Sequence, residues 1–195
     1  MRLGVLVSGR GSNLEAVLDA VADGRLPGMQ PVVIISNRLA VRALHVAQRH
    51  GVPALTMCRG DFPSGEARDA SIGQALADAG VELALLAGYD QLLRRSYFEA
   101  FHGRTINVHP SLLPRHGGKG MLGLAVHASV LAAGDVETGV TIHEVTGELD
   151  AGTPLLQVRV PVLAGDTPER LAERVLAVEH RSVVDVLGRI AGPAA

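Results

Sequence analysis

The strongest constraint on the fold is an alternation of short apolar runs with segments of helical periodicity. Runs at residues 3–7, 32–35, 54–57, 83–87 and 105–109 are typical of buried parallel strands. Between them, residues 14–21, 40–50 and 66–79 place apolar side chains at helical spacing, and Gly24, Gly51 and Gly80 mark where these helices end. This order predicts an α/β fold of the Rossmann-like type, an open, mostly parallel sheet with helices on both faces.

The second half of the chain departs from this alternation. A loop rich in proline and glycine at residues 110–120 leads to a predicted helix at 124–133. Strand-like segments at 140–145 and 155–162 flank a turn-rich stretch at 146–153, which favours an antiparallel strand pair added to the sheet. A final helix is predicted over 168–190, with Asp166 or Thr167 as its N-cap and Pro168 at its first position. We expect one domain over residues 1–195.

The composition excludes several classes of protein. Hydrophobic residues make up 47% of the chain and charged residues 19%, which excludes extended disorder. A net charge of −2 indicates neither nucleic acid nor a membrane surface as a partner, and no apolar run reaches the ~18 residues of a spanning helix. The first residues run directly into a strand pattern rather than a signal peptide, so a cytoplasmic location is expected. The single cysteine, Cys58, can form neither an internal disulfide nor a zinc cluster.

The first candidate site is the turn from Ser8 to Asn13, which joins the first strand to the first helix. Its two glycines allow the backbone to approach a ligand, and the helix N-terminus offers free N–H groups and a positive dipole end to a phosphate. The alternative is an ordinary tight turn in which Ser12 or Asn13 caps the helix.

A dinucleotide site is another interpretation of the same turn. Gly9 and Gly11 lack the third glycine of the NAD fingerprint, and Ser36-Asn37-Arg38 lacks the acid that would hold an NAD ribose. Arg38 could bind a 2′-phosphate instead, so an NADP-dependent reductase stays open as an alternative.

A non-enzymatic alternative is a sensor of phosphoribosyl ligands, which would need the glycine turn but no catalytic residues.

The second candidate site closes the strand at residues 105–109. Alternation along a strand puts Asn107 and His109 on one face, at the carboxyl end where open α/β sheets bind their ligands. Both side chains can donate hydrogen bonds to one oxygen, as a developing oxyanion requires. The alternative is that Asn107 caps a turn and His109 is a buried, satisfied histidine.

Two acidic positions further along the chain are open to interpretation. Asp150 lies in a turn, where it would stabilise an imidazolium only if the fold brings it to His109. Periodicity alone puts Glu179 and His180 on a solvated face of the final helix. A metal site is disfavoured, because no pair of the histidines has the spacing of ligands on one helix face. The histidines considered for it are His102, His109, His116 and His127.

These segments together resemble one family. The residues that carry the resemblance are Ser8-Gly9-x-Gly11-Ser12-Asn13-Leu14, Asn107-x-His109-Pro110-Ser111-Leu112-Leu113-Pro114, Leu149-Asp150-x-Gly152, Gly165-Asp166-Thr167 and Glu179-His180. The chain is similar to the phosphoribosylglycinamide formyltransferases, the folate-dependent enzymes of purine synthesis, over essentially its whole length. The middle motif is shared by formyltransferases in general, whereas the Gly-Ser-Asn turn and the short chain favour the glycinamide ribonucleotide branch.

The resemblance implies a reaction and a site. It implies transfer of the formyl group of 10-formyltetrahydrofolate to the amine of glycinamide ribonucleotide, without a metal, by a monomer or homodimer. The N-terminal half would bind the ribonucleotide and the C-terminal half the folate, with Asn107, His109 and Asp150 as the catalytic trio. The implied ribonucleotide contacts are Gly11, Ser12, Asn13 and Glu179. The implied folate contacts are Asp90, Gln91, Leu92, Leu93, Asn107, Thr146, Gly147, Glu148, Leu149 and Asp150.

The chain departs from the commoner family pattern in three places. The folate-side segment usually reads close to Phe-Met-Arg-Ile-Leu, whereas residues 89–93 here read Tyr-Asp-Gln-Leu-Leu. Gly65 stands where an arginine is expected, and Arg68 follows three residues on. The loop at 115–121 is enlarged. Another 10-formyltetrahydrofolate-dependent N-formyltransferase is therefore the main alternative.

Overall fold

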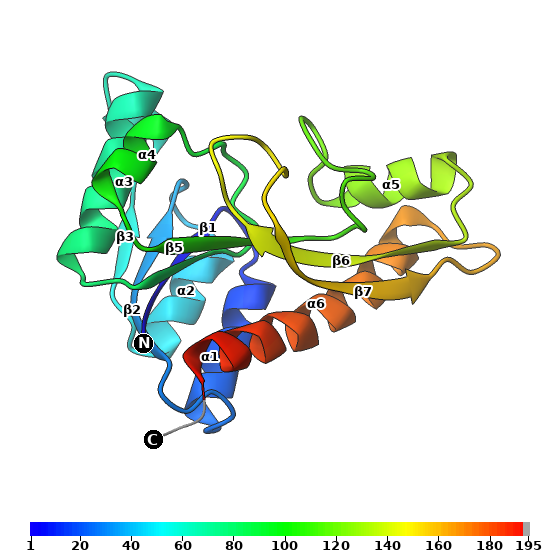
Figure 1. Ribbon diagram of the computed structural model, residues 1–195, viewed down its shortest axis with the longest axis horizontal. Coiled ribbons are helices and arrows are strands. Elements are labelled where there is room, and N and C mark those ends of the chain that lie inside the picture. Colours follow the sequence, from blue (N-terminus) through cyan, green and yellow to red (C-terminus); the bar gives the residue numbers. More distant parts are fainter. Residues whose placement is uncertain (193–195) are drawn as a thin grey trace.

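A seven-stranded sheet forms the centre of the molecule (Figure 1). The computed structural model describes residues 1–192. The strand order is β3-β2-β1-β4-β5-β6-β7. The first five strands in this order are parallel to one another, whereas β6 pairs antiparallel with β5 and β7 pairs antiparallel with β6. The strands are β1 (Arg2–Val7), β2 (Gln30–Ser36), β3 (Ala54–Thr56), β4 (Leu83–Leu86), β5 (Arg104–His109), β6 (Glu137–Glu144) and β7 (Pro154–Pro161). The predicted α/β class, with its antiparallel C-terminal pair, is confirmed.

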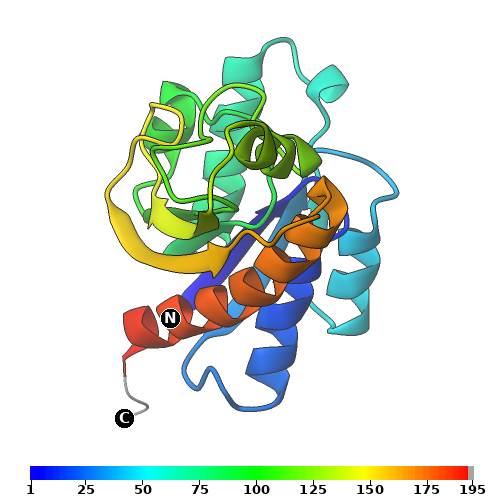
Figure 2. The ribbon, with the colours of Figure 1, turned by 90° about the vertical axis from the view of Figure 1, so that its right-hand side faces the viewer.

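Helices cover both faces of the sheet (Figures 1 and 2). The helices are α1 (Ser12–Ala22), α2 (Arg42–Arg49), η1 (Arg59–Asp61, a 3₁₀ turn), α3 (Gly65–Asp78), α4 (Arg95–Ala100), α5 (Leu124–Ala132) and α6 (Pro168–Ala191). One buried cluster joins the sheet to α1, α2, α5 and α6, and the other joins it to α3 and α4. Strand β1 shows the cause, because Leu3, Val5 and Val7 enter the first cluster while Leu6 enters the second.

The predicted elements all form, and two short ones were missed. Neither η1 nor α4 is long enough to show a periodic pattern, although Tyr97 and Phe101, four residues apart, bury α4 against α3. Strand β6 begins three residues before the predicted start, at Glu137. Its first residues carry no apolar alternation, and Gly139 is needed there because a Cβ would overlap the carbonyl oxygen of Val158.

The final helix begins as its sequence predicts. Thr167 is the N-cap, its hydroxyl accepts a hydrogen bond from the backbone N–H of Arg170, and Pro168 occupies the first turn. Figure 2 shows α6 running alongside α1, which places the last helix of the chain next to its first. Within residues 1–192, none of the helices has the length and apolar character needed to cross a bilayer.

Two helical glycines provide a matched test of this packing. At Gly73 in α3, a Cβ would lie 2.7 Å from the carbonyl oxygen of Tyr97 and 2.8 Å from Ala100 Cβ, whereas at Gly188 in α6 the nearest atom is 3.6 Å away. Overpacking costs about 1–3 kcal/mol, and Gly→Ala inside a helix otherwise stabilises by roughly 0.5–1 kcal/mol. We expect Gly73→Ala to lower the free energy of unfolding in urea and Gly188→Ala to raise it. Equal stability of the two variants would contradict the close approach of α3 and α4.

Candidate active site

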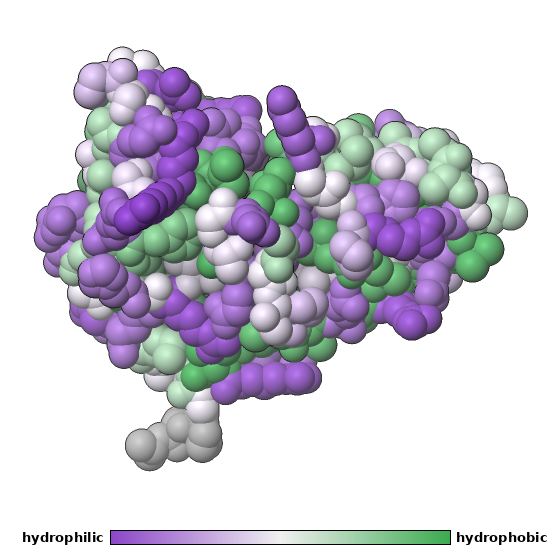
Figure 3. All heavy atoms as spheres, turned by 45° about the horizontal axis from the view of Figure 1, so that its top comes forward, coloured by the Kyte–Doolittle hydropathy of each residue, from purple (hydrophilic) through white to green (hydrophobic). Residues whose placement is uncertain are grey.

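A cleft of about 540 Å³ opens at the carboxyl ends of β1, β4 and β5. The sequence-predicted site residues line it, with the exception of Gly147, which lies in the turn beside it. Exposed leucines line part of the cleft, namely Leu92, Leu122 and Leu149. Figure 3 shows hydrophobic residues in the middle of this face, with hydrophilic residues on either side. The cleft therefore combines an apolar surface with the polar groups described below.

The turn between β1 and α1 leaves the helix N-terminus open. The alternative in which Ser12 or Asn13 caps α1 is wrong, because Gly11 is the N-cap and no side chain in the described part of the chain caps it. Gly11 has φ +72°, and a Cβ there would lie 2.7 Å from Ala43 Cβ, so only glycine fits this passage of the backbone. The amides of the first turn face the cleft, as an anion site requires.

Asn13 connects this turn to the last helix. Its Nδ2 donates a hydrogen bond to Glu179 Oε2 at 2.6 Å, and its Oδ1 is buried without a partner among the described residues. Burial raises the pKa of Glu179, and the hydrogen bond from Asn13 offsets this only in part. The solvated-face interpretation of Glu179 and His180 is wrong: Glu179 is 9% exposed, and burial lowers the pKa of His180.

The predicted trio converges in the cleft. Asn107 and His109 both line it, as their alternation along β5 predicts. Asp150 reaches them from the turn between β6 and β7, with its Oδ1 3.8 Å from Nδ1 of His109. The sequence could not show this contact, because 40 residues separate the two and the turn's path depends on the pairing of β6 with β5.

His109 has one ring nitrogen that is already engaged. Its Nε2 lies 2.9 Å from the backbone carbonyl oxygen of His116. A carbonyl oxygen can only accept, so Nε2 carries a hydrogen and Nδ1 is the nitrogen that faces Asp150. A proton added at Nδ1 would lie on the side of the ring that faces the Asp150 carboxylate.

His143 is a site residue that the sequence analysis missed. Its Nδ1 donates to the carbonyl of Glu144 at 2.8 Å, which leaves Nε2 to accept from Asn107 Nδ2 at 3.1 Å. Burial lowers the pKa of His143, which keeps the ring neutral and able to accept. Its partner on β5 is Asn107, so the pairing register brings the two together. The second N–H of the Asn107 amide remains for a ligand.

The loop after β5 closes against Asp150. The backbone N–H of Gly118 donates to Asp150 Oδ2 at 2.8 Å. A Cβ at Gly117 would lie 2.6 Å from Leu113 Cδ2 and 3.5 Å from the same carboxylate oxygen, so glycine is required for this approach. The peptide bond before Pro114 is cis.

Asp90 lines the cleft, but its carboxylate is held by protein groups. Asn37 and Gln91 donate to its Oδ1 at 2.7 and 3.2 Å, and Arg38 pairs with its Oδ2. Burial raises the pKa of Asp90, but the hydrogen bonds, including that of Ser8, and the Arg38 charge outweigh it, so the pKa is lowered. Arg38 is thus engaged by an acid, which disfavours the 2′-phosphate role expected for an NADP-dependent reductase.

One further feature of the cleft was not predicted from the sequence. His127 of α5 is buried, and its Nδ1 has no hydrogen-bond partner within residues 1–192. Burial lowers its pKa, and the nearby charge of His109 lowers it further. The same residues contain no group of three or more histidine, cysteine or acidic side chains placed to hold a metal ion.

Comparisons with known proteins identify the family of the chain. The formyl transferase family profile matches residues 1–187. The chain belongs to this family. A chloroplastic phosphoribosylglycinamide formyltransferase of Arabidopsis thaliana is 40% identical over 190 residues, which are 97% of this chain and 65% of that protein. The Escherichia coli K12 phosphoribosylglycinamide formyltransferase is 36% identical over 92% of this chain and 82% of its own.

A solved formyltransferase has nearly the same backbone. Glycinamide ribonucleotide transformylase 1 from Symbiobacterium toebii superposes with a TM-score of 0.91 and 42% identity, over 98% of this chain and 87% of that one. The chain spans under two thirds of the plant relative and less than a fifth of the animal trifunctional purine biosynthetic proteins that it matches. The resemblance to the formyltransferases is confirmed.

The buried carboxyl of Glu179 provides a test of the site's electrostatics. Burial makes the pKa of Glu179 higher in the folded state than in the unfolded state. Below the unfolded-state pKa the protonated carboxyl therefore contributes fully to the free energy of unfolding, and this contribution is lost as the pH rises through the folded-state pKa. Glu179→Gln keeps an oxygen that can accept from Asn13 but removes the buried charge. We expect the variant to be more stable than the parent chain at about pH 7.5 and equal to it at about pH 4, measured by urea unfolding.

The exposed Glu173 on the same helix supplies the control. Glu173→Gln should change stability little at either pH. A Glu179→Gln variant that is less stable than the parent at neutral pH would show that the carboxylate is better accommodated than its burial indicates.

Proposed function

We propose that the chain transfers the formyl group of 10-formyltetrahydrofolate to the amine of glycinamide ribonucleotide, which gives formylglycinamide ribonucleotide and tetrahydrofolate. The observation that carries the proposal is the convergence of Asn107, His109 and Asp150 in a cleft that also contains an open helix N-terminus. Membership of the formyl transferase family, and the names of the relatives, support the same reaction.

The ribonucleotide end of the cleft lies where α1 begins. In this proposal Gly11, Ser12 and Asn13 hold the phosphate and ribose through backbone amides and the Asn13 side chain. The unpartnered Asn13 Oδ1 is an acceptor for a ribose hydroxyl, and Glu179 orients the amide from behind. An anion at this end needs no lysine or arginine, because the helix dipole and free N–H groups supply the positive potential.

The folate end has a different character. In this proposal the apolar surfaces of Leu92, Leu93 and Leu149 pack against the flat ring systems of the folate. Backbone groups of Gln91 and of residues 146–148 border this end and supply hydrogen-bonding positions. The Asp90 side chain is engaged by protein donors, so we assign it a role in holding the segment rather than in direct contact with the folate.

The chemistry follows from the geometry of the trio. The neutral amine of the ribonucleotide attacks the formyl carbon, and negative charge grows on the formyl oxygen in the transition state. The free N–H of Asn107 and the Nδ1–H of protonated His109 donate to that oxygen. Asp150 stabilises the imidazolium, and through water it carries the proton lost by the attacking amine to the leaving nitrogen.

We further propose that a single domain carries both ends of the cleft. The N-terminal half contributes Gly11–Asn13, and the C-terminal half contributes residues 146–150. Glu179 reaches the ribonucleotide end from the last helix. We propose a cytoplasmic monomer or homodimer whose substrates are the two small molecules.

One assay tests the reaction directly. Purified protein is mixed with 10-formyltetrahydrofolate and glycinamide ribonucleotide, and the formylated product and tetrahydrofolate are quantified. The proposal expects both products in equal amounts. Turnover with an amino sugar nucleotide, but not with glycinamide ribonucleotide, would instead select another N-formyltransferase of the same family.

Substitutions in the trio test the assigned roles. Loss of one oxyanion donor typically lowers kcat by ~10²–10³. We therefore expect Asn107→Ala and His109→Ala each to lower kcat by that factor, while the Kd for glycinamide ribonucleotide, measured by calorimetry, stays within about twofold. His102→Ala, at an exposed histidine outside the cleft, is the control. Near-normal kcat in either trio variant would contradict the mechanism.

A further inference from the structure

The proposed catalytic histidine is held from behind by a backbone carbonyl. The His116 carbonyl oxygen lies 2.9 Å from His109 Nε2, and the Ser111 hydroxyl lies 3.5 Å from the same oxygen while donating to the carbonyl of Arg115 at 2.7 Å. The loop is fastened in turn to the sheet, since Thr141 Oγ1 donates to the Ser111 carbonyl at 2.7 Å. The position of the His116 backbone therefore decides which nitrogen of His109 faces the cleft.

The side chain of His116 is itself clamped at both ring nitrogens. Its Nδ1 lies 2.9 Å from Ser129 Oγ in α5, and its Nε2 lies 2.8 Å from Asp135 Oδ2 just after that helix. The side chain is 10% exposed, and the residue has φ +54°. Such a backbone conformation is uncommon outside glycine and persists where the surroundings determine it strongly. We call Ser129, His116 and Asp135 the His116 clamp.

The carboxylate of the clamp stays charged. The hydrogen bond from His116 is the largest cause of the lowered pKa of Asp135, and Arg115 adds an ion pair to its other oxygen. Asp135 therefore accepts from His116 Nε2, and His116 Nδ1 is left to accept from the Ser129 hydroxyl. Both hydrogen bonds then have consistent donors and acceptors in the neutral form of the ring.

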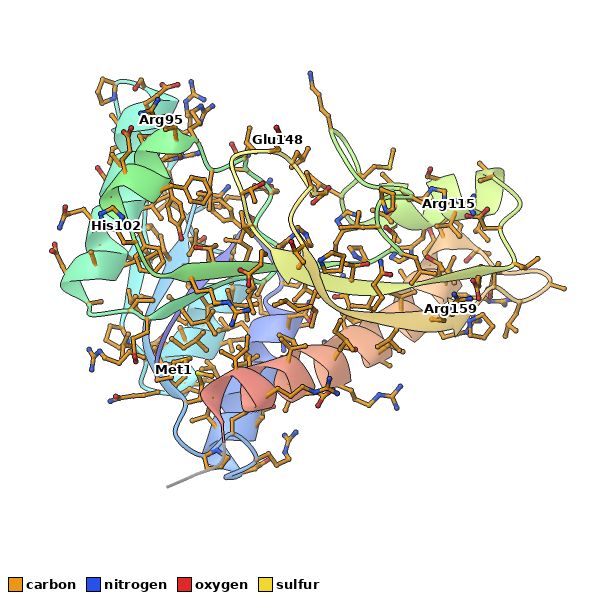
Figure 4. All side chains as sticks on the ribbon, viewed as in Figure 1. Met1, Arg95, His102, Arg115, Glu148 and Arg159 are labelled. Carbon is orange, nitrogen blue, oxygen red and sulfur yellow. The ribbon has the colours of Figure 1, made fainter. Side chains whose placement is uncertain are left out.

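A hydrolytic function for these three residues is disfavoured. Serine, histidine and aspartate in hydrogen-bond contact are also the components of a nucleophilic triad. Ser129 and His116, however, are not among the residues that line the cleft, so the hydroxyl is not placed beside a substrate bound there. Figure 4 shows Arg115, next to His116 in sequence, lying at α5 on the outer side of the loop.

We propose that His116 is a positioning residue: the His116 clamp fixes the backbone carbonyl that keeps His109 in its Nε2–H form, with Nδ1 turned toward Asp150 and the cleft. This inference rests on the catalytic role given to His109 under the proposed function. Its consequence is that α5, which has no residue in the trio, controls the orientation of the catalytic imidazole.

Two variants release the clamp with little risk to the fold. Ser129→Ala removes one hydrogen bond from a helical position. His116→Asn keeps a residue type that tolerates positive φ but cannot reach both Ser129 and Asp135. Ser129→Thr keeps the hydroxyl and should behave as the parent chain. His102→Asn, at an exposed histidine near α4 and far from Arg115 in Figure 4, is the matched histidine control.

The first readout is spectroscopic and independent of activity. Long-range ¹H–¹⁵N spectra of the imidazoles report the tautomer of His109 in the free protein. The parent chain, Ser129→Thr and His102→Asn should show the Nε2–H form, and the two release variants should show a mixture. An unchanged His109 tautomer in both release variants would overturn the proposal.

The second readout is kinetic. Misplaced catalytic groups typically cost ~10–100-fold in rate, so kcat of both release variants should fall by that factor while KM for the ribonucleotide changes by less than about threefold. A changed tautomer with unchanged kcat would overturn the positioning role. Absence of formyl transfer by the parent chain would refute the proposed function alone, since the spectra would still decide whether the clamp sets the His109 tautomer.

Discussion

The antiparallel pairing of β5 with β6 is the constraint on which the site depends. Its register puts Asn107 opposite His143, and it starts the β6–β7 connection at the point from which Asp150 can reach His109. A slip of one residue would turn every side chain of β6 to the opposite face. His143 would then no longer lie opposite Asn107, and the turn that carries Asp150 would begin at a different point of the sheet. The parallel part of the sheet carries the turn proposed to bind the phosphate, and the added strand β6 brings His143 and Asp150 to Asn107 and His109.

The histidines around the cleft divide into different electrostatic roles because their surroundings differ. Burial lowers the pKa of His143 and His127, which favours the neutral form of both rings. One carboxylate faces two rings, since Asp150 Oδ1 lies 3.8 Å from His109 Nδ1 and 3.7 Å from His143 Nε2. His143 Nε2 also accepts from Asn107 Nδ2 at 3.1 Å, which orients the Asn107 amide.

Local patterns predicted the fold and part of the site. Strand and helix positions follow from the period of buried residues, and the shared face of Asn107 and His109 follows from strand alternation. Periodicity and spacing could not supply contacts between distant segments, and the approach of Asp150 to His109 was implied only by the family resemblance. Glu179 looked solvated because α6 was considered alone, whereas its partner Asn13 lies 166 residues earlier. His143 carried no signal, because the register of an antiparallel pair separated by a long loop cannot be read from spacing.

The glycine at position 65 is coupled to the placement of Arg94. Arg68 does not replace the missing arginine at position 65, because it is 1% exposed and donates from Nε and Nη2 to Asp69 Oδ1. The other oxygen of Asp69 accepts from Arg94 at 2.9 Å. This holds the Arg94 guanidinium 2.5 Å from where a Cβ of Gly65 would lie. A side chain at position 65 and this placement of Arg94 exclude each other, so the cationic group beside the start of α3 comes from Arg94, the N-cap of α4.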